Sequence, residues 1–272
     1  MGYGHRKGIE NKDIEYVDMH GHYGHWKFKD NRKETFEKMK RNGCQFIVEC
    51  GCDLKSINNT IKLAQENDFI YASIGFFPHN VQELYKKNVR EQFLQLLDEY
   101  KVVMIGECGF DFSRKGVSAK EQEKEFRWQI ELAIDKKMPI CIHSRDAEED
   151  TIRVLNEYKK EKDFIPYIHS YSYGYDTAMK LQEMGAYFGC GGMLTYKRNE
   201  QLRYALRDID EQYILFETDA PYLPPESLRG QINTALNIPQ IANVLAGVRE
   251  ENPINLMQQA TKNSYRLLSL EQ

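Results

Sequence analysis

The chain has 272 residues, of which 41% are hydrophobic and 12% aromatic, a composition typical of a globular protein and unlike that of a disordered one. Its formal net charge of −4 argues against a broad basic surface that binds long nucleic acid through many phosphates. No apolar run is long enough to span a bilayer, and six cysteines without disulfide spacing fit a reducing compartment, so we expect a cytoplasmic protein without membrane contact.

Short apolar runs alternate with longer amphipathic segments from residue 14 to the end of the chain, and no linker-like stretch interrupts them. We therefore expect a polar N-terminal arm at residues 1–13 and a single domain at residues 14–272. The predicted strands are residues 14–20, 44–51, 69–75, 102–107, 139–143, 164–169, 186–191 and 213–218. The predicted helices are residues 31–42, 53–67, 84–100, 118–137, 147–161, 173–184, 198–208, 233–247 and 253–269.

Local signals support three of the predicted helix starts. Ser118 and Glu121 form the spacing of a capping box, Asp53 is placed as an N-cap, and Asn252 precedes a proline in a first helical turn. Eight strands, each followed by a helix, predict an α/β fold of the (β/α)8 TIM-barrel type. An open doubly wound sheet is the alternative, but its G-x-G-x-x-G signature is missing after the first strand.

Metal-capable side chains follow the predicted strands. The stretch YVDMHGH alternates Asp18, His20 and His22, which would share one face of a strand. In a barrel the carboxyl ends of all strands meet at one mouth, and strand 8 closes beside strand 1. The residues expected there are His20, His22, Glu107, His143, His169 and Asp219.

A metal centre is the simplest account of this set. Four imidazoles and two carboxylates cannot be desolvated together without strong compensation, which divalent ions provide. Six ligands exceed the need of one four-coordinate zinc, so we expect two ions, of Mg, Mn or Zn type, and metal-assisted hydrolysis. Taken singly, each of these residues could instead be an ordinary buried histidine or a helix cap.

Five ordered motifs resemble the TatD family of metal-dependent deoxyribonucleases, which are amidohydrolase-like barrels: VDMHGH, IGECGFDF, IHSRDA, IHS and ETDAPYL. The resemblance implies that His20, His22 and Asp219 hold one metal, that His143 and His169 hold the other, and that Glu107 bridges both. It also implies that Asp219 accepts the proton of the attacking water. Asp18 would orient a histidine, with a plain buried aspartate as the alternative.

The departures from this family pattern concern the substrate. GFFPHN places Phe77 where a histidine is usual and keeps His79, which we expect to contact substrate. Arg145 could meet a phosphate, or only form a surface salt bridge. The added aromatic residues could stack on a base or simply pack in the core. They are Phe76, Phe77, Tyr171 and Tyr173.

The function implied is metal-dependent hydrolysis of DNA by a 3′-5′ exonuclease, acting on single strands or exposed ends, because a closed cup admits a single strand more readily than a duplex. No obligate protein partner can be read from the sequence. The alternatives are a hydrolase of another small phosphoester, ester or amide on the same barrel, and a non-catalytic metal-binding subunit.

Overall fold

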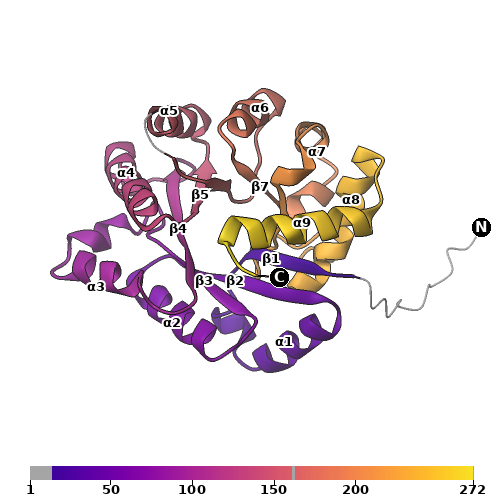
Figure 1. Cartoon of the computed structure of the whole chain (residues 1–272), viewed down its shortest axis with the longest axis horizontal. Coiled ribbons are helices and arrows are strands. Elements are labelled where there is room, and N and C mark those ends of the chain that lie inside the picture. The colour runs from indigo at the N-terminus through magenta and orange to yellow at the C-terminus, as the bar shows by residue number, and fades with distance from the viewer. Residues whose placement is uncertain (1–13, 161–162, 272) are drawn as a thin grey trace, which may run out of the picture.

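The computed structural model describes residues 14–160 and 163–271, and the predicted arm at residues 1–13 lies outside them. Eight parallel strands form one sheet in the order β1-β2-β3-β4-β5-β6-β7-β8, with helices around it (Figure 1). Gly21 forms a parallel bridge with Ala220 just after β8, which brings the first and last strands together. The predicted (β/α)8 TIM-barrel fold is confirmed, since the sheet is nearly closed and helices alternate with its strands.

The strands follow the predicted runs, with differences at two functional ends. Strand β4 continues to Asp111 instead of ending at Glu107, because its pairing with β5 shifts register after Ile105 and then resumes. Strand β8 ends at Phe216, because the amide of Thr218 donates to the side-chain carboxylate of Asp18 and not to a backbone carbonyl. The strands are β1 Tyr16–Gly21, β2 Cys44–Gly51, β3 Ile70–Ile74, β4 Val102–Asp111, β5 Ile140–Arg145, β6 Pro166–Ile168, β7 Tyr187–Cys190 and β8 Ile214–Phe216.

Two predicted helices differ from those observed. The expected helix at 84–100 is a 3-10 turn, Val81–Tyr85, followed by a short helix, because Asn88 takes a left-handed conformation with φ of 63° between them. The helix expected from residue 233 begins at Ile238, with a proline in its first turn. The helices are α1 Arg32–Arg41, α2 Leu54–Gln65, α3 Val89–Leu96, α4 Ala119–Lys136, α5 Glu148–Lys159, α6 Tyr175–Glu183, α7 Glu200–Arg207, α8 Ile238–Arg249 and α9 Pro253–Leu268.

The expected helix caps are confirmed. Ser118 and Glu121 form a reciprocal capping box at α4. Asp53 forms another at α2, where its carboxylate accepts a bond from the amide of Ser56. The side chain of Asn252 accepts bonds from two amides in the first turn of α9. These local sequence signals therefore predicted where three helices begin.

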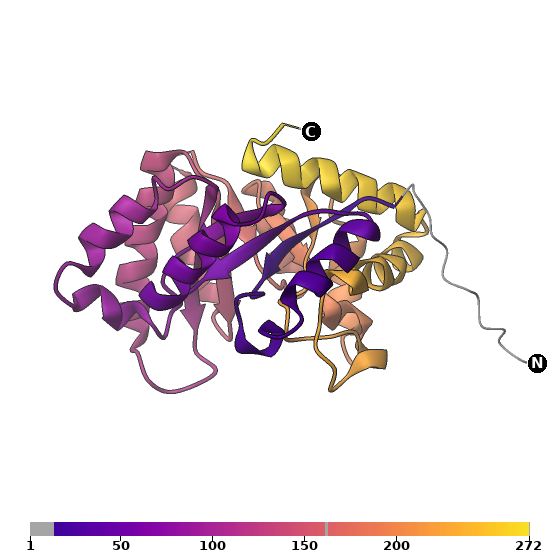
Figure 2. The same cartoon turned by 90° about the horizontal axis from the view of Figure 1, so that it is seen from below.

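The barrel has an apolar end and a polar end. Inside it, buried residues such as Val17, Met104 and Tyr167 pack together with Leu267 and Leu268 of α9. Figure 2 shows α9 on one side of the strands and the loops after β1 and β8 on the other. The carboxyl ends of the strands therefore lie at the end of the barrel opposite α9. No helix in the described parts of the chain has the length and apolarity needed to cross a bilayer.

Candidate metal centre

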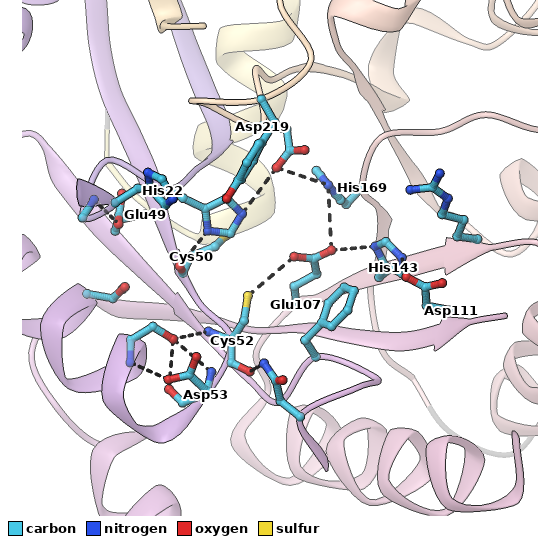
Figure 3. A pocket seen from close by; sticks show the side chains of 18 of the residues that line it. His22, Glu49, Cys50, Cys52, Asp53, Glu107, Asp111, His143, His169 and Asp219 are labelled. Carbon is cyan, nitrogen blue, oxygen red and sulfur yellow. Dashed lines mark hydrogen bonds and ion pairs between the residues drawn. The ribbon is translucent and has the colours of Figure 1, made fainter. Parts of the chain in front are cut away.

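Metal-capable side chains from five parts of the barrel converge at its carboxyl-terminal mouth (Figure 3). They come from β1 and the residue after it, from β4, from β5, and from the segments following β6 and β8. Although these residues are far apart in the chain, the parallel strands bring their ends to a common edge. The predicted set does meet there: His20, His22, Glu107, His143, His169 and Asp219.

Glu107 lies at the centre of this set and faces histidines with both carboxylate oxygens. Its Oε2 is 3.5 Å from His20 Nε2. Its Oε1 is 2.7 Å from His143 Nδ1 and 3.9 Å from His169 Nε2. The carboxylate is only 5% exposed, so these imidazoles form its main electrostatic environment. One carboxylate is thus shared between two histidine groups.

Asp219, in the segment after β8, faces three of the histidines. Its Oδ1 is 3.3 Å from His22 Nε2, 3.9 Å from His20 Nε2 and 4.0 Å from His169 Nε2. The residue takes a left-handed backbone conformation, with φ of 58°, and its amide donates to the carbonyl of His20 at 2.9 Å. Such a conformation is uncommon outside glycine and is often found at functional sites.

The ligand atoms fit divalent ions. Among the described residues they form three overlapping groups, and all atoms of a group lie within 4.8 Å of one another. The groups are His20, His22 and Glu107; His20, His169 and Asp219; and Glu107, His143 and His169. Imidazole and carboxylate donors together suit zinc, manganese or iron. The buried Nε2 of His143 makes no hydrogen bond to any described residue, and the Asp111 carboxylate lies 3.4 Å from it as an ion-pair partner.

The electrostatics of the set match this donor chemistry. Burial alone would raise the pKa of Glu107, but hydrogen bonding to His143 and the charges of the other histidines hold that pKa well below its usual range. Burial alone would lower the pKa of His143, yet Asp111 and Glu107 raise it to about 9. The carboxylates therefore keep the charged form, in which they can bind cations, whereas His143 would have to release a proton to bind one.

Buried carboxylates that sequence reasoning missed support the site from behind. Glu217 lies 3.0 Å from His169 Nδ1 and accepts a bond from the amide of Ser170 at 2.7 Å. Asp111 Oδ2 lies 3.4 Å from His143 Nε2. Carboxylates in this position fix the ring orientation of metal-binding histidines. Glu217 lies in the motif ETDAPYL and Asp111 in GFDF, so the sequence motifs could have pointed to both residues.

Asp18 bonds to no histidine ring, which fits the alternative of a buried, hydrogen-bonded aspartate. Its carboxylate accepts bonds from the Tyr23 hydroxyl at 2.8 Å, the Thr218 hydroxyl at 2.6 Å and the Thr218 amide at 2.9 Å. The pairing of β1 with β2 shifts register between Asp18 and Gly21, so strict alternation of faces is lost there. Asp18 therefore joins the first and last strands, and it contacts the ligand set only through the His20 amide, which donates to its Oδ1 at 3.4 Å.

The ring of His20 rests on two thiols. Its Nδ1 lies 3.2 Å from Cys50 Sγ and 3.5 Å from Cys141 Sγ. Cys52, two residues after Cys50, faces the cavity, with its Sγ 3.6 Å from Glu107 Oε2. All six cysteines of the chain are free. The cysteines at the end of β2 therefore surround the ligand set without a disulfide, as their spacing predicted.

A cavity of about 640 Å³ opens above the ligand set. Arg145 lines it, as predicted for a phosphate contact, and so does Arg114, which was not foreseen. His79 faces the side chain of Asp111, with Nε2 3.7 Å from Oδ1, and is not among the residues lining the cavity. Its predicted substrate contact therefore has no direct counterpart in this geometry.

Phe77, where the family pattern usually has a histidine, lies beside the ligand set. The Phe77 ring lies 4.7 Å from the ring of His143, and the Arg114 guanidinium stands 5.6 Å from the Phe77 ring centroid. The Arg114 guanidinium thus lies over the Phe77 ring, and both residues line the cavity. Two of the other aromatic residues considered for stacking are core residues, since Phe76 is 0% and Tyr171 2% exposed, and the Tyr173 hydroxyl bonds to Ser144.

Comparison with known proteins agrees with this geometry. YabD of Bacillus subtilis, described as an uncharacterized metal-dependent hydrolase, is 29% identical over 93% of this chain and 98% of its own length. A protein of Pantoea ananatis named 3′-5′ ssDNA/RNA exonuclease TatD is 29% identical over 89% of this chain and 95% of its own. The crystal structure of YjjV, a TatD homolog from Escherichia coli K12, has a TM-score of 0.85 at 23% identity, over 95% of this chain and 100% of that one, and shows the shared fold. Residues 17–269 match the sequence model of the family described as TatD related DNase, and the chain belongs to that family.

Proposed function

We propose that this protein is a two-metal phosphodiesterase that removes nucleotides from exposed single-stranded DNA ends in the 3′-5′ direction. The observation that carries the proposal is the convergence of four imidazoles and two carboxylates at the base of one open cavity. Such a donor set suits metal-assisted hydrolysis, whereas no serine or cysteine lies in a recognisable nucleophile motif.

The two faces of Glu107 suggest how the ions divide. His20, His22 and Asp219 would hold one ion, His143 and His169 the other, and Glu107 would serve both, since its two oxygens face different histidines. Divalent ions bound there would lower the pKa of a coordinated water and neutralise charge on the phosphate, and magnesium, manganese and zinc are all candidates.

The residues of the chain have distinct roles in this proposal. Asp219 stands at the mouth beside His22 and is held ionised by it, so its carboxylate orients the attacking water and accepts its proton. Arg145, at the end of β5, and Arg114, in the loop after β4, both line the cavity and would bind the non-bridging phosphate oxygens. Phe77 has no donor to offer, and Arg114 above it supplies the positive charge.

Two observations support single-stranded DNA ends as the substrate: the size of the cavity and the names of the relatives. A cavity of about 640 Å³ is large enough for roughly one nucleotide, and a net charge of −4 argues against a broad basic face that would bind a duplex. Relatives from Pantoea ananatis and Pectobacterium atrosepticum carry the name 3′-5′ ssDNA/RNA exonuclease TatD. Their named activity suits a site that admits one strand.

The test is release of mononucleotides from a 3′-labelled single strand with magnesium or manganese, together with elemental analysis of the purified protein. Asp219→Asn should lower release about 100- to 10,000-fold, and His143→Ala should lower both release and metal content. The control Asp208→Asn changes a carboxylate in the exposed segment after α7 and should leave release unchanged. Equal release by wild type and Asp219→Asn would overturn the proposal.

Phe77 favours a second candidate, a hydrolase of a less highly charged ester or amide, because its apolar ring lines the cavity beside His143. A panel of aryl esters, amides and phosphodiesters separates the two. Cleavage of amides or esters without any phosphodiester cleavage would favour the second candidate. A stable metal-free protein without activity on any member of the panel would instead indicate a non-catalytic subunit.

A further inference from the structure

Three aromatic rings form a row from the ligand set to the surface, here called the aromatic row: Tyr222, His25 and Trp26. The ring of Tyr222 lies 6.2 Å from that of His22 and 5.7 Å from that of His25, and the His25 ring lies 5.4 Å from Trp26, all between centroids. Tyr222 and His25 line the cavity, and Trp26 extends the row beyond it. The three rings thus follow one another from solvent to His22, in T-shaped and tilted contacts.

The aromatic row is exposed but held in place. Trp26 is 73% and Tyr222 45% exposed. Scattered exposed aromatics are ordinary, whereas adjacent ones at the rim of a cavity mark a binding surface. Phe28, in the same 3-10 turn as Trp26, is buried, and Arg32 Nε donates to the carbonyl of Tyr23 at 2.7 Å. The rings therefore meet a ligand without first having to be ordered, which favours binding.

A cation accompanies the aromatic row. Lys27 Nζ lies 5.9 Å from the centroid of the Tyr222 ring, and Lys27 follows Trp26 directly in the chain. Flat rings beside a positive charge suit a nucleotide, which carries a planar base and a phosphate on the same sugar. Because the whole chain carries a net charge of −4, this local cation is a feature of the rim and not of a generally basic surface.

We propose that the aromatic row is a stacking site for unpaired bases of the strand whose phosphate lies at the ligand set. This inference rests on the proposed phosphodiesterase function and extends it to the part of the substrate that remains outside the cavity. Stacking requires a free base face, which a single strand offers and a duplex does not, because bases inside a duplex already stack on their neighbours. The site therefore selects single strands without reading their sequence.

The two tryptophans of the chain allow a direct test by fluorescence. Trp128 lies on α4, 5.8 Å from the ring of Phe93 and 4.3 Å from the Arg90 guanidinium. In Trp128→Phe the remaining tryptophan, Trp26, reports on the aromatic row. We expect a single-stranded oligonucleotide to quench its emission in a saturable way, and a strand of equal length with abasic sites to quench it far less.

The reciprocal protein and a matched surface variant serve as controls. Trp26→Phe keeps only Trp128, whose emission should not change with the oligonucleotide. Trp26→Ala and Tyr222→Ala should each weaken oligonucleotide binding about 5-fold or more. Tyr100→Ala removes a ring that is 74% exposed just before β4, at the opposite end of the strands, and should leave binding unchanged.

Hydrolysis kinetics separate this inference from the proposed function. Trp26→Ala should raise KM for an oligonucleotide far more than KM for a small aryl phosphodiester. Equal quenching by abasic and base-bearing strands, or unchanged oligonucleotide binding in both alanine variants, would overturn the proposed stacking site. Neither result would contradict the proposed phosphodiester hydrolysis. Base-dependent quenching without hydrolysis of any phosphodiester would instead support stacking and overturn the proposed chemistry.

Discussion

The two ends of the barrel put the same strands to opposite uses. Near α9 the interior is filled by apolar side chains such as Met19, Val48 and Leu215, with Leu267 of α9 among them. A few residues further along the strands, imidazoles and carboxylates take the place of these apolar side chains. Glu107, which is 5% exposed, is one of them. The first end gains stability from burial, whereas the second buries ionisable groups at a cost that only mutual pairing or bound cations offset.

This contrast teaches that stability and chemistry are separable along one strand. Changes at the mouth should alter activity with little effect on the fold, and changes near α9 should do the reverse. The following predictions test that separation, from the largest expected effect to the smallest.

The largest effect is expected for Glu107→Gln at the mouth. Because Glu107 contacts three of the histidines, the neutral amide should lower metal content and reduce phosphodiester hydrolysis by about 100- to 10,000-fold. Elemental analysis and initial rates measure both, with circular dichroism to check the fold. Glu37→Gln, on the exposed face of α1, is the matched control and should keep full activity. Full activity in Glu107→Gln would contradict the claim that the polar end of the barrel carries the chemistry.

Leu267→Ala at the opposite end should show the reverse pattern. Deleting this buried side chain, 1% exposed, should lower the free energy of unfolding by about 2–5 kcal/mol and leave kcat unchanged below the melting temperature. Urea denaturation and rates at 25 °C provide the two measurements. Leu94→Ala, at a residue 38% exposed on α3, should change the free energy of unfolding by about 0.5 kcal/mol or less. A lowered kcat in Leu267→Ala would show that the two ends are coupled.

The same contrast explains what the sequence could predict. The fold was readable because apolar runs have the lengths of strands and because capping residues such as Ser118 and Asp53 act locally. The six expected ligand residues could be named because parallel strands bring their carboxyl ends to one edge. No pairing of individual side chains was needed for either step.

Features that depend on register or on distant neighbours could not be predicted in this way. Asp18 left the expected face because β1 shifts register against β2, and nothing in YVDMHGH encodes that shift. Glu217 supports His169 from 48 residues away. Arg114 reaches the cavity from a loop outside any motif, so only the folded chain reveals it opposite Phe77.

A smaller effect at the mouth is expected for Glu217→Gln. The amide keeps the shape of the side chain but weakens its charge-assisted contact with His169 Nδ1, now 3.0 Å, so metal affinity or activity should fall about 10- to 100-fold. Titration of the metal-free protein with manganese measures the affinity. Glu183→Gln, on the exposed side of α6, is the control. An unchanged affinity would mean that the orientation of His169 is set by backbone packing alone.

The smallest effect concerns a carboxylate that lies outside the barrel altogether. Glu123 on α4 pairs with Arg153 and Arg127, with Oε2 2.7 Å from Arg153 Nη2 and Oε1 2.8 Å from Arg127 Nη2. Arg153, and then Arg127, hold the pKa of Glu123 below its ordinary value of 4.5, at about 2. Because the pKa is depressed in the folded state, the stabilisation is complete above about pH 4.5 and is lost as the pH falls toward 2.

Glu123→Gln should therefore lower the free energy of unfolding at pH 7 by less than about 1 kcal/mol, since all three side chains are partly exposed and solvent screens their charges. The difference from wild type should shrink between pH 5 and about pH 3, measured by urea denaturation, and also in high salt. Arg153→Gln also removes pairs with Asp150 and Glu157. The double variant should therefore lose less than the sum of the two single changes, because both remove the Glu123–Arg153 pair. A difference that grows in acid would contradict this assignment. Unlike Glu107, Glu123 belongs to no group of candidate metal ligands among the described residues, so its contribution should depend on pH and salt and not on metal.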